Sequence, residues 1–574
     1  MDYKSAKEAF VADNPGTSIW TVNAVSLVGL TSYYLYATQA QATSRTSPWI
    51  DFIISILPLL LGQTVFSSRP IAFNIALVVI STITWKLLSR KTEPVLGHEP
   101  ANLQTPPTII SEKKPTRTKS DKSNLIPGLR PPRLILPQRR RSPSLTPESD
   151  MHTIKINSPS PTSNTFPPNS SQDLTSTPRS TLDPATTSTS TSTSTEASPL
   201  TRFPPQPFLS VYRAQMMLMT IVAILAVDFP VFPREFGKCE DWGTSLMDIG
   251  VGSFVFSLGL TSAAPFLRLD SPTTTVLNTV LSGLRKSIPV WILGVVRVLM
   301  VKGVEYPEHM TEYGVHWNFF FTLGSMPLFG GMFGTLRRWV RFRDMGLVVM
   351  VVHLLGLGVG LQDWVMGPDR TGLIGLNKEG IVSLPGYIAI YLLGIDIGHY
   401  ILPPDPYFAF PEKPYVKEEE DVPDYDSRGV EKGKAERRKE ELGMILGSYA
   451  IIWWSLLAVV WLFGGRVSRR LANPSYVIWT AAFNTTFLAG YLLVELLVFG
   501  AENKRQRRVV PPLMAAFNKN GLVLFLAANL LTGLINVSMK TMYASDSTAL
   551  VVLSGYLVVL SGVAWVIRHK RFMI

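Results

Sequence analysis

The stretch TALVVLSGYLVVLSGVAWVI, residues 548–567, runs for twenty residues without a charged side chain. An α-helix rises about 1.5 Å per residue, so about 20 apolar residues cross the roughly 30 Å hydrocarbon core of a bilayer. A stretch this long and this apolar therefore predicts a transmembrane helix.

Twelve further stretches of similar character predict spans at residues 18–36, 49–66, 70–88, 211–227, 244–260, 288–301, 317–333, 345–361, 383–401, 445–463, 476–499 and 522–538. The chain has 574 residues, of which 46% are hydrophobic and 17% charged, whereas soluble domains carry about 25% charged residues. The sequence thus predicts an all-α polytopic membrane protein with about 13 transmembrane helices.

The composition divides the chain into three parts. Residues 1–91 contain the first three predicted spans, and residues 206–574 contain a ten-helix membrane domain. Residues 92–205 are crowded with Pro, Ser and Thr, and such a segment buries too little apolar surface to offset its chain entropy. We expect a long disordered cytosolic linker there, and a charged cytosolic loop at residues 402–444.

The formal net charge of +12 arises from basic residues in loops between the apolar stretches. This pattern follows the positive-inside rule and argues against nucleic acid as a partner. Basic clusters at residues 337–343, 504–508 and 568–571 fall on one face of the thirteen-span arrangement. We therefore expect a cytosolic carboxyl terminus and a luminal amino terminus, against which stand Arg466, Arg469 and Arg470 on the luminal side.

Two further features narrow the possibilities. Residues 1–14 lack the pattern of a removable signal peptide, so we expect the first span to direct membrane insertion. Cys239 is the only cysteine of the chain, which excludes an intrachain disulfide and a CxxC centre.

Ionisable residues within or beside membrane spans are costly, so each is a functional candidate. They are Asp228, Asp248, Arg297, His353, Asp396, His399 and Glu495. Asp396 and His399 share a helix face, which favours a packing hydrogen bond over a proton-handling pair. No GxSxG, HExxH or Walker motif is present.

Asp228 is the strongest functional candidate among these ionisable residues. It ends the fourth span directly before Pro230 and Pro233, which stop the helix. A tight turn would return Arg234 or Lys238 to the carboxylate. Spacing alone leaves open a catalytic Asp–Lys pair and an ordinary interfacial ion pair.

The stretch YGVHWNFFF, residues 313–321, places a His and an Asn on either side of Trp317 at the mouth of a span. An interfacial aromatic belt explains the aromatic residues, but it leaves Asn318 in need of a partner. We therefore expect His316, Trp317 and Asn318 to line a substrate cavity. Weaker signals add Asn377 and Lys378 as contacts for an anionic headgroup or CoA.

Five stretches together carry a resemblance to a known family. They are DFPVFPREFGK at residues 228–238, WGTSLMDIGVGS at 242–253, YGVHWNFFF at 313–321, NKEGI at 377–381 and NLLTGLIN at 529–536. In these stretches the chain closely resembles the fungal GPI-anchored wall transfer proteins and their animal counterpart, phosphatidylinositol-glycan class W. The resemblance covers most of the membrane portion, and the linker matches in position and character.

The resemblance implies an inositol acyltransferase of the endoplasmic reticulum membrane that acts in GPI-anchor biosynthesis. Such an enzyme moves a fatty acyl chain, typically palmitoyl, from acyl-CoA to the inositol 2-hydroxyl of glucosaminyl-phosphatidylinositol. The family's catalytic aspartate and lysine map onto Asp228 and Lys238 in a luminal loop. Acyl-CoA would be a co-substrate, with no cofactor and no metal, and the matching stretches add Arg234, Trp242 and Asp248 as substrate-binding candidates.

Two alternatives remain at this point. A polytopic lipid or solute transporter would also show many spans and intramembrane charges. An acyltransferase of the membrane-bound O-acyl type would use His353 or His399 as its base.

Overall fold

The computed structural model describes residues 3–12, 14, 16–42, 47–89, 206–267, 276–302, 310–403, 406, 434–500 and 509–572. The described residues contain helices and no strand. The predicted linker at 92–205 and most of the predicted charged loop lie outside the described residues.

The chain before the linker contains α1 (Tyr3–Val11), α2 (Ile19–Ala42), α3 (Pro48–Ser55), α4 (Leu57–Gln63) and α5 (Pro70–Ser89). The part after the linker contains α6 (Pro207–Ala226), η1 (Arg234–Phe236), α7 (Leu246–Leu267), α8 (Val276–Lys302), α9 (Met310–Tyr313), α10 (Phe319–Gly334), α11 (Phe342–Gly356), η2 (Leu357–Leu361), α12 (Gln362–Met366), α13 (Gly372–Leu376), α14 (Lys378–Ile401), α15 (Lys434–Leu462), α16 (Pro474–Phe499), α17 (Pro512–Lys519), α18 (Gly521–Ser538), η3 (Thr541–Tyr543) and α19 (Asp546–Ile567).

Ten helices of the described residues are long and apolar enough to cross a membrane. The other three predicted spans fall on α2, on α3 with α4, and on α10. The prediction of an all-α polytopic membrane protein is therefore confirmed. The spans before and after the linker belong to one compact unit, in which α2 packs against α5, α6 and α16.

The structure differs from the predicted spans at three places. Helix α8 begins at Val276, well before the predicted start at residue 288, and α15 begins at Lys434, inside the segment predicted as a charged loop. The span at 345–361 is interrupted by a π-helical turn, η2, in which Gly360 has φ 115°. A glycine tolerates this positive φ without steric cost, so the chain can bend there and continue as α12.

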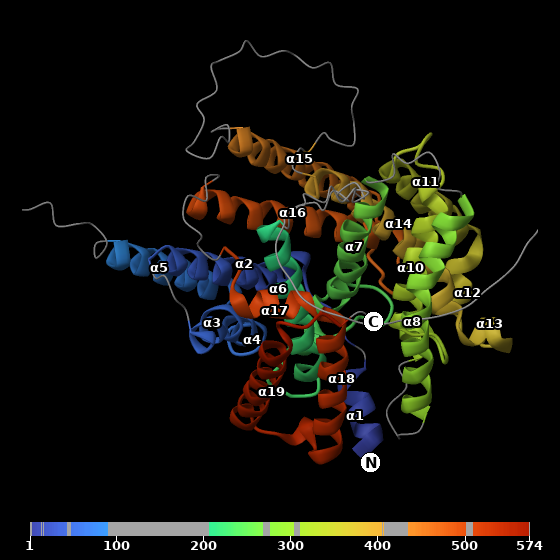
Figure 1. Ribbon diagram of the computed structural model, residues 1–574. Coiled ribbons are helices and arrows are strands. Elements are labelled where there is room, and N and C mark those ends of the chain that lie inside the picture. Colours follow the sequence, from blue (N-terminus) through green and yellow to red (C-terminus); the bar gives the residue numbers. More distant parts are fainter. Residues whose placement is uncertain are drawn as a thin grey trace, which may run out of the picture. The chain divides into compact units, whose positions relative to one another are not determined.

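Helix α14 contacts α7, α11, α16 and α10, and 83% of its apolar span is buried within the protein (Figure 1). Its crossing with α7 is close because glycines face each other. A Cβ on Gly259 would lie 2.3 Å from the carbonyl oxygen of Tyr391, and one on Gly394 would lie 2.3 Å from that of Phe256. Small residues allow such close approach between membrane helices.

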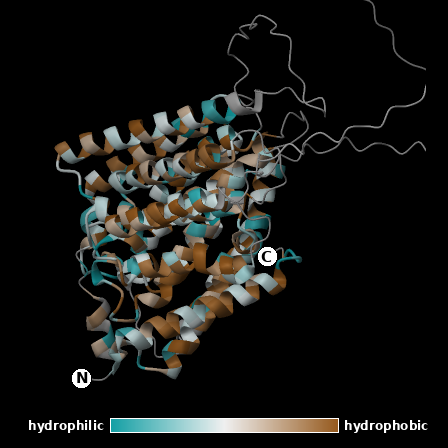
Figure 2. Ribbon diagram, turned by 90° about the vertical axis from the view of Figure 1, so that its left-hand side faces the viewer, coloured by the Kyte–Doolittle hydropathy of each residue, from teal (hydrophilic) through white to brown (hydrophobic). Residues whose placement is uncertain are grey.

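Large apolar side chains are exposed on many of the helices, and hydrophobic residues colour much of the length of the helices in Figure 2. Leu299 on α8 is 67% exposed and Val566 on α19 is 77% exposed. In water such apolar surfaces would favour association between molecules. In a bilayer they contact lipid acyl chains, which are equally apolar. The exposed apolar surface therefore fits a protein embedded in a bilayer.

Candidate active site

Asp228 lies in the turn that follows α6. The helix ends at Ala226, and the chain then turns through Pro230 and Pro233 into η1. Neither proline can donate the backbone hydrogen bond that would continue the helix. Asp228 is only 3% exposed, so its carboxylate needs partners inside the protein.

Both carboxylate oxygens of Asp228 have partners from distant parts of the chain. Lys7 Nζ on α1 lies 3.1 Å from Oδ1, and Asn536 Nδ2 on α18 donates to Oδ2 at 2.8 Å. Lys7 Nζ also donates to Asn536 Oδ1 at 2.9 Å, and Thr541 Oγ1 donates to the same atom at 3.1 Å. Charge-assisted hydrogen bonds of this kind hold an ionised carboxylate in a fixed orientation.

Lys238 does not contact Asp228, although the sequence suggested that the turn would bring them together. Its Nζ lies 2.6 Å from Glu312 Oε1 on α9. Lys7 takes the position beside the carboxylate instead. The expected direct ion pair between Asp228 and Lys238 is therefore wrong.

Arg234 ends the same turn by a different set of contacts. Its Nη2 donates to the carbonyl oxygens of Val227, Phe229 and Phe232, and its guanidinium lies 4.2 Å from the ring centroid of Phe10. Burial lowers the pKa of the Arg234 guanidinium, and the charge of Asp228 opposes that shift. Arg234 therefore stabilises the carbonyl groups at the carboxyl end of α6.

Asp228 and Lys238 line one cavity of about 610 Å³. Its charged lining residues are Lys7, Asp228, Lys238, Glu240, Arg297, Glu312 and Arg469. The remaining lining is mostly apolar and comes mainly from α6, α7, α8, α10, α16 and α18, with Met216, Met219, Phe254, Phe319, Phe320 and Phe525 among its members. The cavity thus combines charged groups with walls suited to a hydrocarbon chain.

Asp248 lies outside this lining and holds one of its residues in place. Arg469 Nε lies 2.7 Å from Asp248 Oδ1, and both side chains are almost fully buried. The backbone nitrogen of Cys239 donates to Asp248 Oδ2 at 3.1 Å. Burial lowers the pKa of Arg469, but the charges of Asp248 and Glu312 outweigh it and raise that pKa. Burial and Asp248 raise the pKa of the Cys239 thiol, so the thiol stays protonated.

His316, Trp317 and Asn318 do not line this cavity, contrary to the prediction. Asn318 is the N-cap of α10, where Oδ1 accepts from Phe320 N at 3.0 Å and Nδ2 donates to Gly294 O at 2.9 Å. Trp317 Nε1 donates to Thr322 Oγ1 at 2.9 Å. The polar group that the aromatic belt left unexplained is therefore a helix cap.

The side chains of Asn377 and Lys378 also form hydrogen bonds within the protein. Asn377 Oδ1 accepts from the backbone nitrogens of His316 and Trp317, each at 2.8 Å. Lys378 is fully buried, and its Nζ donates to the carbonyl oxygens of Trp364, Gly367 and Asp369. The predicted contacts with an anionic headgroup do not fit these positions, because neither residue lines the cavity.

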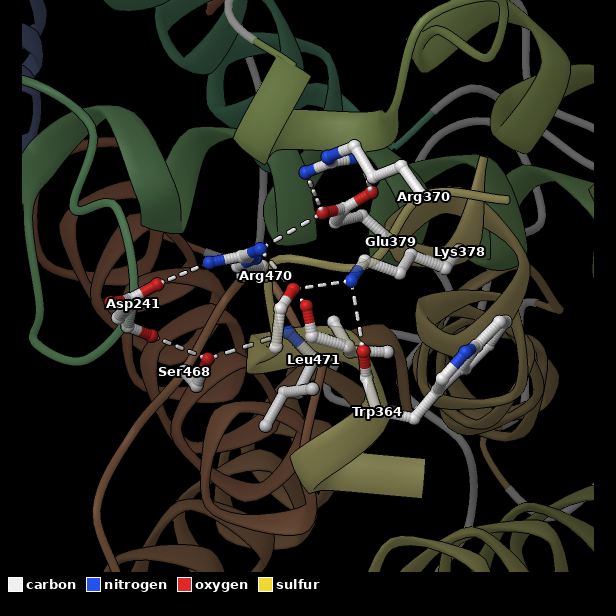
Figure 3. A network of polar contacts seen from close by, with 10 residues as sticks. Asp241, Trp364, Arg370, Lys378, Glu379, Ser468, Arg470 and Leu471 are labelled. Carbon is white, nitrogen blue, oxygen red and sulfur yellow. Dashed lines mark hydrogen bonds and ion pairs between the residues drawn. The ribbon is translucent and has the colours of Figure 1, made fainter. Parts of the chain in front are cut away.

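Glu379, the neighbour of Lys378, lies at the centre of a buried network (Figure 3). Arg370 Nη2 lies 2.6 Å from Glu379 Oε1, and Arg470 Nη2 lies 2.9 Å from the same oxygen. Arg470 also reaches Asp241. Trp242 follows Asp241 and packs against the apolar side chains of Leu357, Val365, Val382 and Leu471. Trp242 therefore contributes to packing and not to the cavity lining.

The histidines of the alternative mechanism also lie outside the lining. His353 Nε2 lies 3.0 Å from Leu471 O, and His399 Nδ1 lies 2.8 Å from Ile395 O. Asp396 accepts a hydrogen bond from the hydroxyl of Tyr449 on α15 at 2.9 Å. This contact is of the packing type that the sequence favoured.

Three residues of the site were missed by sequence reasoning, namely Lys7, Glu312 and Asn536. Asn536 had a usable signal, because Asn529 and Asn536 are seven residues apart on α18 and both line the cavity. Lys7 and Glu312 lie in short helices that give no membrane signal. Among the described residues, no group of three or more His, Cys, Asp or Glu side chains could hold a metal ion.

Comparison with known proteins gives one consistent result. The sequence model of the GWT1 family matches residues 3–134 and 160–567. A protein named GPI-anchored wall transfer protein 1 from Cryptococcus neoformans var. grubii is 40% identical over 627 aligned residues, covering 100% of both chains. The proteins of that name from Aspergillus fumigatus and Candida albicans are 34% and 28% identical, covering 100% and 96% of this chain and 99% and 95% of their own. The chain belongs to the GWT1 family, as its sequence motifs indicated.

Proposed function

We propose that this protein is an inositol acyltransferase of GPI-anchor biosynthesis in the endoplasmic reticulum membrane. It would transfer a fatty acyl group, typically palmitoyl, from acyl-CoA to the inositol 2-hydroxyl of glucosaminyl-phosphatidylinositol. The observation that carries this proposal is the buried carboxylate of Asp228, held on both oxygens, in a cavity whose other walls are apolar.

In the proposed reaction Asp228 is the general base. The inositol oxygen attacks the thioester carbonyl carbon while its proton passes to Asp228, and the tetrahedral intermediate then expels the CoA sulfur, which recovers a proton. An ionised carboxylate offers about four lone-pair sites. Asp228 can therefore accept the substrate hydroxyl while Lys7 and Asn536 keep their contacts. General-base catalysis of this kind contributes roughly 10²- to 10⁴-fold in rate.

Lys238 would stabilise the oxyanion that forms on the thioester carbonyl. Its side chain lines the cavity and is 33% exposed, and its partner Glu312 also lines the cavity and is 17% exposed. Glu312 keeps the ammonium group in the cavity wall, so Lys238 acts on the substrate and not through Asp228. Lys238 would therefore keep the catalytic role that the resemblance implies, with Glu312 and not Asp228 as its ion-pair partner.

The apolar walls would bring two lipid substrates together. The acyl chain and the diacyl tails leave lipid for an equally apolar surface, while the charged residues hold the inositol end near the thioester. Fixing both reactants in this way converts a bimolecular step into an effectively unimolecular one, which lowers the barrier by several kcal/mol.

We place the Asp228 loop in the lumen and the carboxyl terminus in the cytosol. The main objection was the luminal position of Arg466, Arg469 and Arg470, of which Arg466 is exposed and remains a luminal basic residue, whereas the other two differ from it. Both are buried, 3% and 6% exposed, and both form ion pairs with carboxylates of the protein. Buried and neutralised charges are not the flexible loop charges that the positive-inside rule counts, so the remaining basic clusters support this orientation.

The test uses purified protein in liposomes with acyl-CoA and glucosaminyl-phosphatidylinositol, and mass spectrometry of the lipid product. The proposal predicts an inositol-acylated lipid and release of free CoA. Asp396→Asn is a matched control, because Asp396 is also a buried carboxylate but does not line the cavity. Transport of lipid without consumption of acyl-CoA would favour the transporter alternative and would contradict the proposal.

A further inference from the structure

Asp248 is a buried carboxylate near the start of α7, and its two oxygens have different partners. Oδ1 lies 2.7 Å from Arg469 Nε, and Oδ2 accepts from the backbone nitrogen of Cys239 at 3.1 Å. The backbone of Asp248 is fixed as well, because its nitrogen donates to Ser245 Oγ at 3.1 Å and its carbonyl oxygen accepts from the Tyr476 hydroxyl at 2.7 Å. The carboxylate is therefore held in a fixed position between two other parts of the chain.

The contact with Cys239 acts on Lys238, which is the preceding residue of the chain. Both lie in the segment between η1 and α7, which forms no helix, so its backbone depends on contacts with other parts of the protein. The same segment is joined to the loop before α16, where Ser468 Oγ donates to Asp241 O at 2.6 Å. Asp248 thus helps to fix the stretch of backbone that carries Lys238.

The contact with Arg469 acts on the partner of Lys238. The Arg469 guanidinium lies 5.9 Å from the ring centroid of Tyr313, the residue that follows Glu312 in α9. The charges of Asp248 and Glu312 both raise the pKa of Arg469. Helix α9 has only four residues, and a single helical turn is unstable without contacts outside itself. Arg469 therefore helps to hold the short helix that carries Glu312.

These contacts form a closed ring. One side runs from Asp248 through Cys239 to Lys238. The other side runs from Asp248 through Arg469 to Glu312. The ion pair of 2.6 Å between Lys238 Nζ and Glu312 Oε1 closes the ring. A partly exposed lysine pair contributes little by itself, and its long side chain is flexible, so the position of the ammonium depends on how firmly both ends are held.

We infer that Asp248 is a positioning residue for Lys238, on which it acts through both sides of this contact ring. It does not line the cavity and would touch no substrate. Desolvation of a buried ion pair offsets most of its attraction, so net stability alone does not account for the pair with Arg469. The inference rests on the proposed function, in which Lys238 stabilises the oxyanion. A misplacement of about 1 Å can cost roughly 10²-fold in rate.

The test compares Asp248→Asn, Lys238→Ala and the variant with both changes in the liposome assay. Asp248→Asn keeps the volume of the side chain and removes its charge, so kcat should fall by roughly 10- to 100-fold, while KM for acyl-CoA stays the same. Because Asp248 acts through Lys238, the variant with both changes should be no slower than Lys238→Ala. Losses that multiply in that variant, or an unchanged kcat in folded Asp248→Asn, would overturn the inference.

Glu379→Gln is the matched control. Glu379 is also a buried carboxylate paired with an arginine, Arg470, which is the neighbour of Arg469, but it does not line the cavity. Its kcat should stay near that of the unmodified protein. An equal fall of kcat in Glu379→Gln and Asp248→Asn would show a general effect of removing a buried charge and would contradict the inference.

Reductive methylation of Lys238, followed by mass spectrometry of the peptide that carries it, measures the position of the ammonium without catalysis. Methylation should be slow in the unmodified protein and in Glu379→Gln, and several-fold faster in folded Asp248→Asn. Equal rates in all three would overturn the inference. If the unmodified protein transfers no acyl group, the proposed function fails, whereas faster methylation in Asp248→Asn would still support the contact ring.

A further variant separates positioning from folding. Asp248→Asn leaves Arg469 buried without its carboxylate, which lowers the Tm. Adding Arg469→Gln removes both charges and should recover most of the Tm. Methylation of Lys238 should nevertheless stay fast in this neutral pair, because Glu312 still lacks the charge of Arg469. If methylation becomes slow again together with the recovery of Tm, Asp248 acts only on stability and the inference is wrong.

Discussion

Two buried charge clusters of this protein contain similar residues and have different surroundings. In the first, Glu379 lies between Arg370 and Arg470, and none of the three lines the cavity (Figure 3). In the second, Asp228 lies between Lys7 and Asn536, and all three line the cavity. Both clusters contain a buried carboxylate with a cationic partner, but only the second lines a cavity.

Whether a buried charge of this protein is structural or a candidate for catalysis depends on what lies beside it. The Glu379 cluster joins the loop at Asp241, the start of α14 and the loop before α16. The cluster is structural, because its charged groups form ion pairs with one another and connect these parts of the chain. The Asp228 cluster leaves lone pairs of the carboxylate facing a cavity. A cavity beside the charge, and not the charge alone, marks the candidate for catalysis.

The largest expected effect is that of Asp228→Asn. The substitution keeps the volume of the side chain but removes the base, so acyl transfer per folded protein should fall by roughly 10²- to 10⁴-fold. Thermal stability should change much less than activity. Near-normal turnover in a folded Asp228→Asn variant would show that the Asp228 cluster is no more catalytic than the Glu379 cluster. It would refute the proposed mechanism.

Glu379→Gln should show the opposite profile. It leaves Arg370 and Arg470 without their shared carboxylate, and removing one partner of a buried ion pair costs about 3–5 kcal/mol. The Tm in detergent should fall clearly, while the turnover of the protein that remains folded should stay near normal. Asp344→Asn is the control, since its half-exposed pair with Arg343 contributes little.

Lys7→Met tests whether the charge beside Asp228 matters for the reaction. Losing a hydrogen bond to a charged group costs about 1.5–3 kcal/mol, which corresponds to roughly 10- to 100-fold in turnover if Lys7 holds the base in position. Lys7→Arg should recover part of the rate, and KM for acyl-CoA should stay the same. An unchanged kcat in Lys7→Met would show that Asn536 alone orients the carboxylate.

The smallest effect is expected for Asn318→Ala. Loss of the N-cap of α10 should cost about 1 kcal/mol of stability, which a modest fall in Tm would report. Acyl-CoA affinity and turnover should not change, because Asn318 lies outside the cavity lining. Asn318→Ser keeps a capping oxygen and should restore the Tm. Reduced acyl-CoA affinity in Asn318→Ala would show that Asn318 does take part in substrate binding.

The fold was largely predictable because lipid imposes a simple rule on sequence. Each span must be long and apolar, so all thirteen predicted spans coincide with helices. Helix α1 was not predictable in this way, since its nine residues are not markedly apolar. The hydropathy of the sequence does not predict the π-helical turn at η2 either. Gly360, with its positive φ, is the one residue there that indicates a bend.

The candidate site was predictable only where its signal was local. Asp228 was found because two prolines stop its helix and because it belongs to a family motif. The pairing of Asp228 with Asn536 could not be found, since the two residues are 308 positions apart and no spacing rule connects them, although Asn536 itself lies in a family motif. Asn318 misled the prediction because a helix cap and a ligand contact both place a polar residue at a helix start.

The contact between Lys7 and Asn536 joins residues 529 positions apart in the chain. During synthesis Lys7 is made before Asp228, and both precede α18, which supplies Asn536. The carboxylate therefore acquires its full set of donors only after nearly the whole polypeptide has been inserted. Chains arrested before α18 would be catalytically silent, so acyl transfer would report completed membrane assembly, and no shortened splice form or proteolytic fragment lacking α18 should retain it.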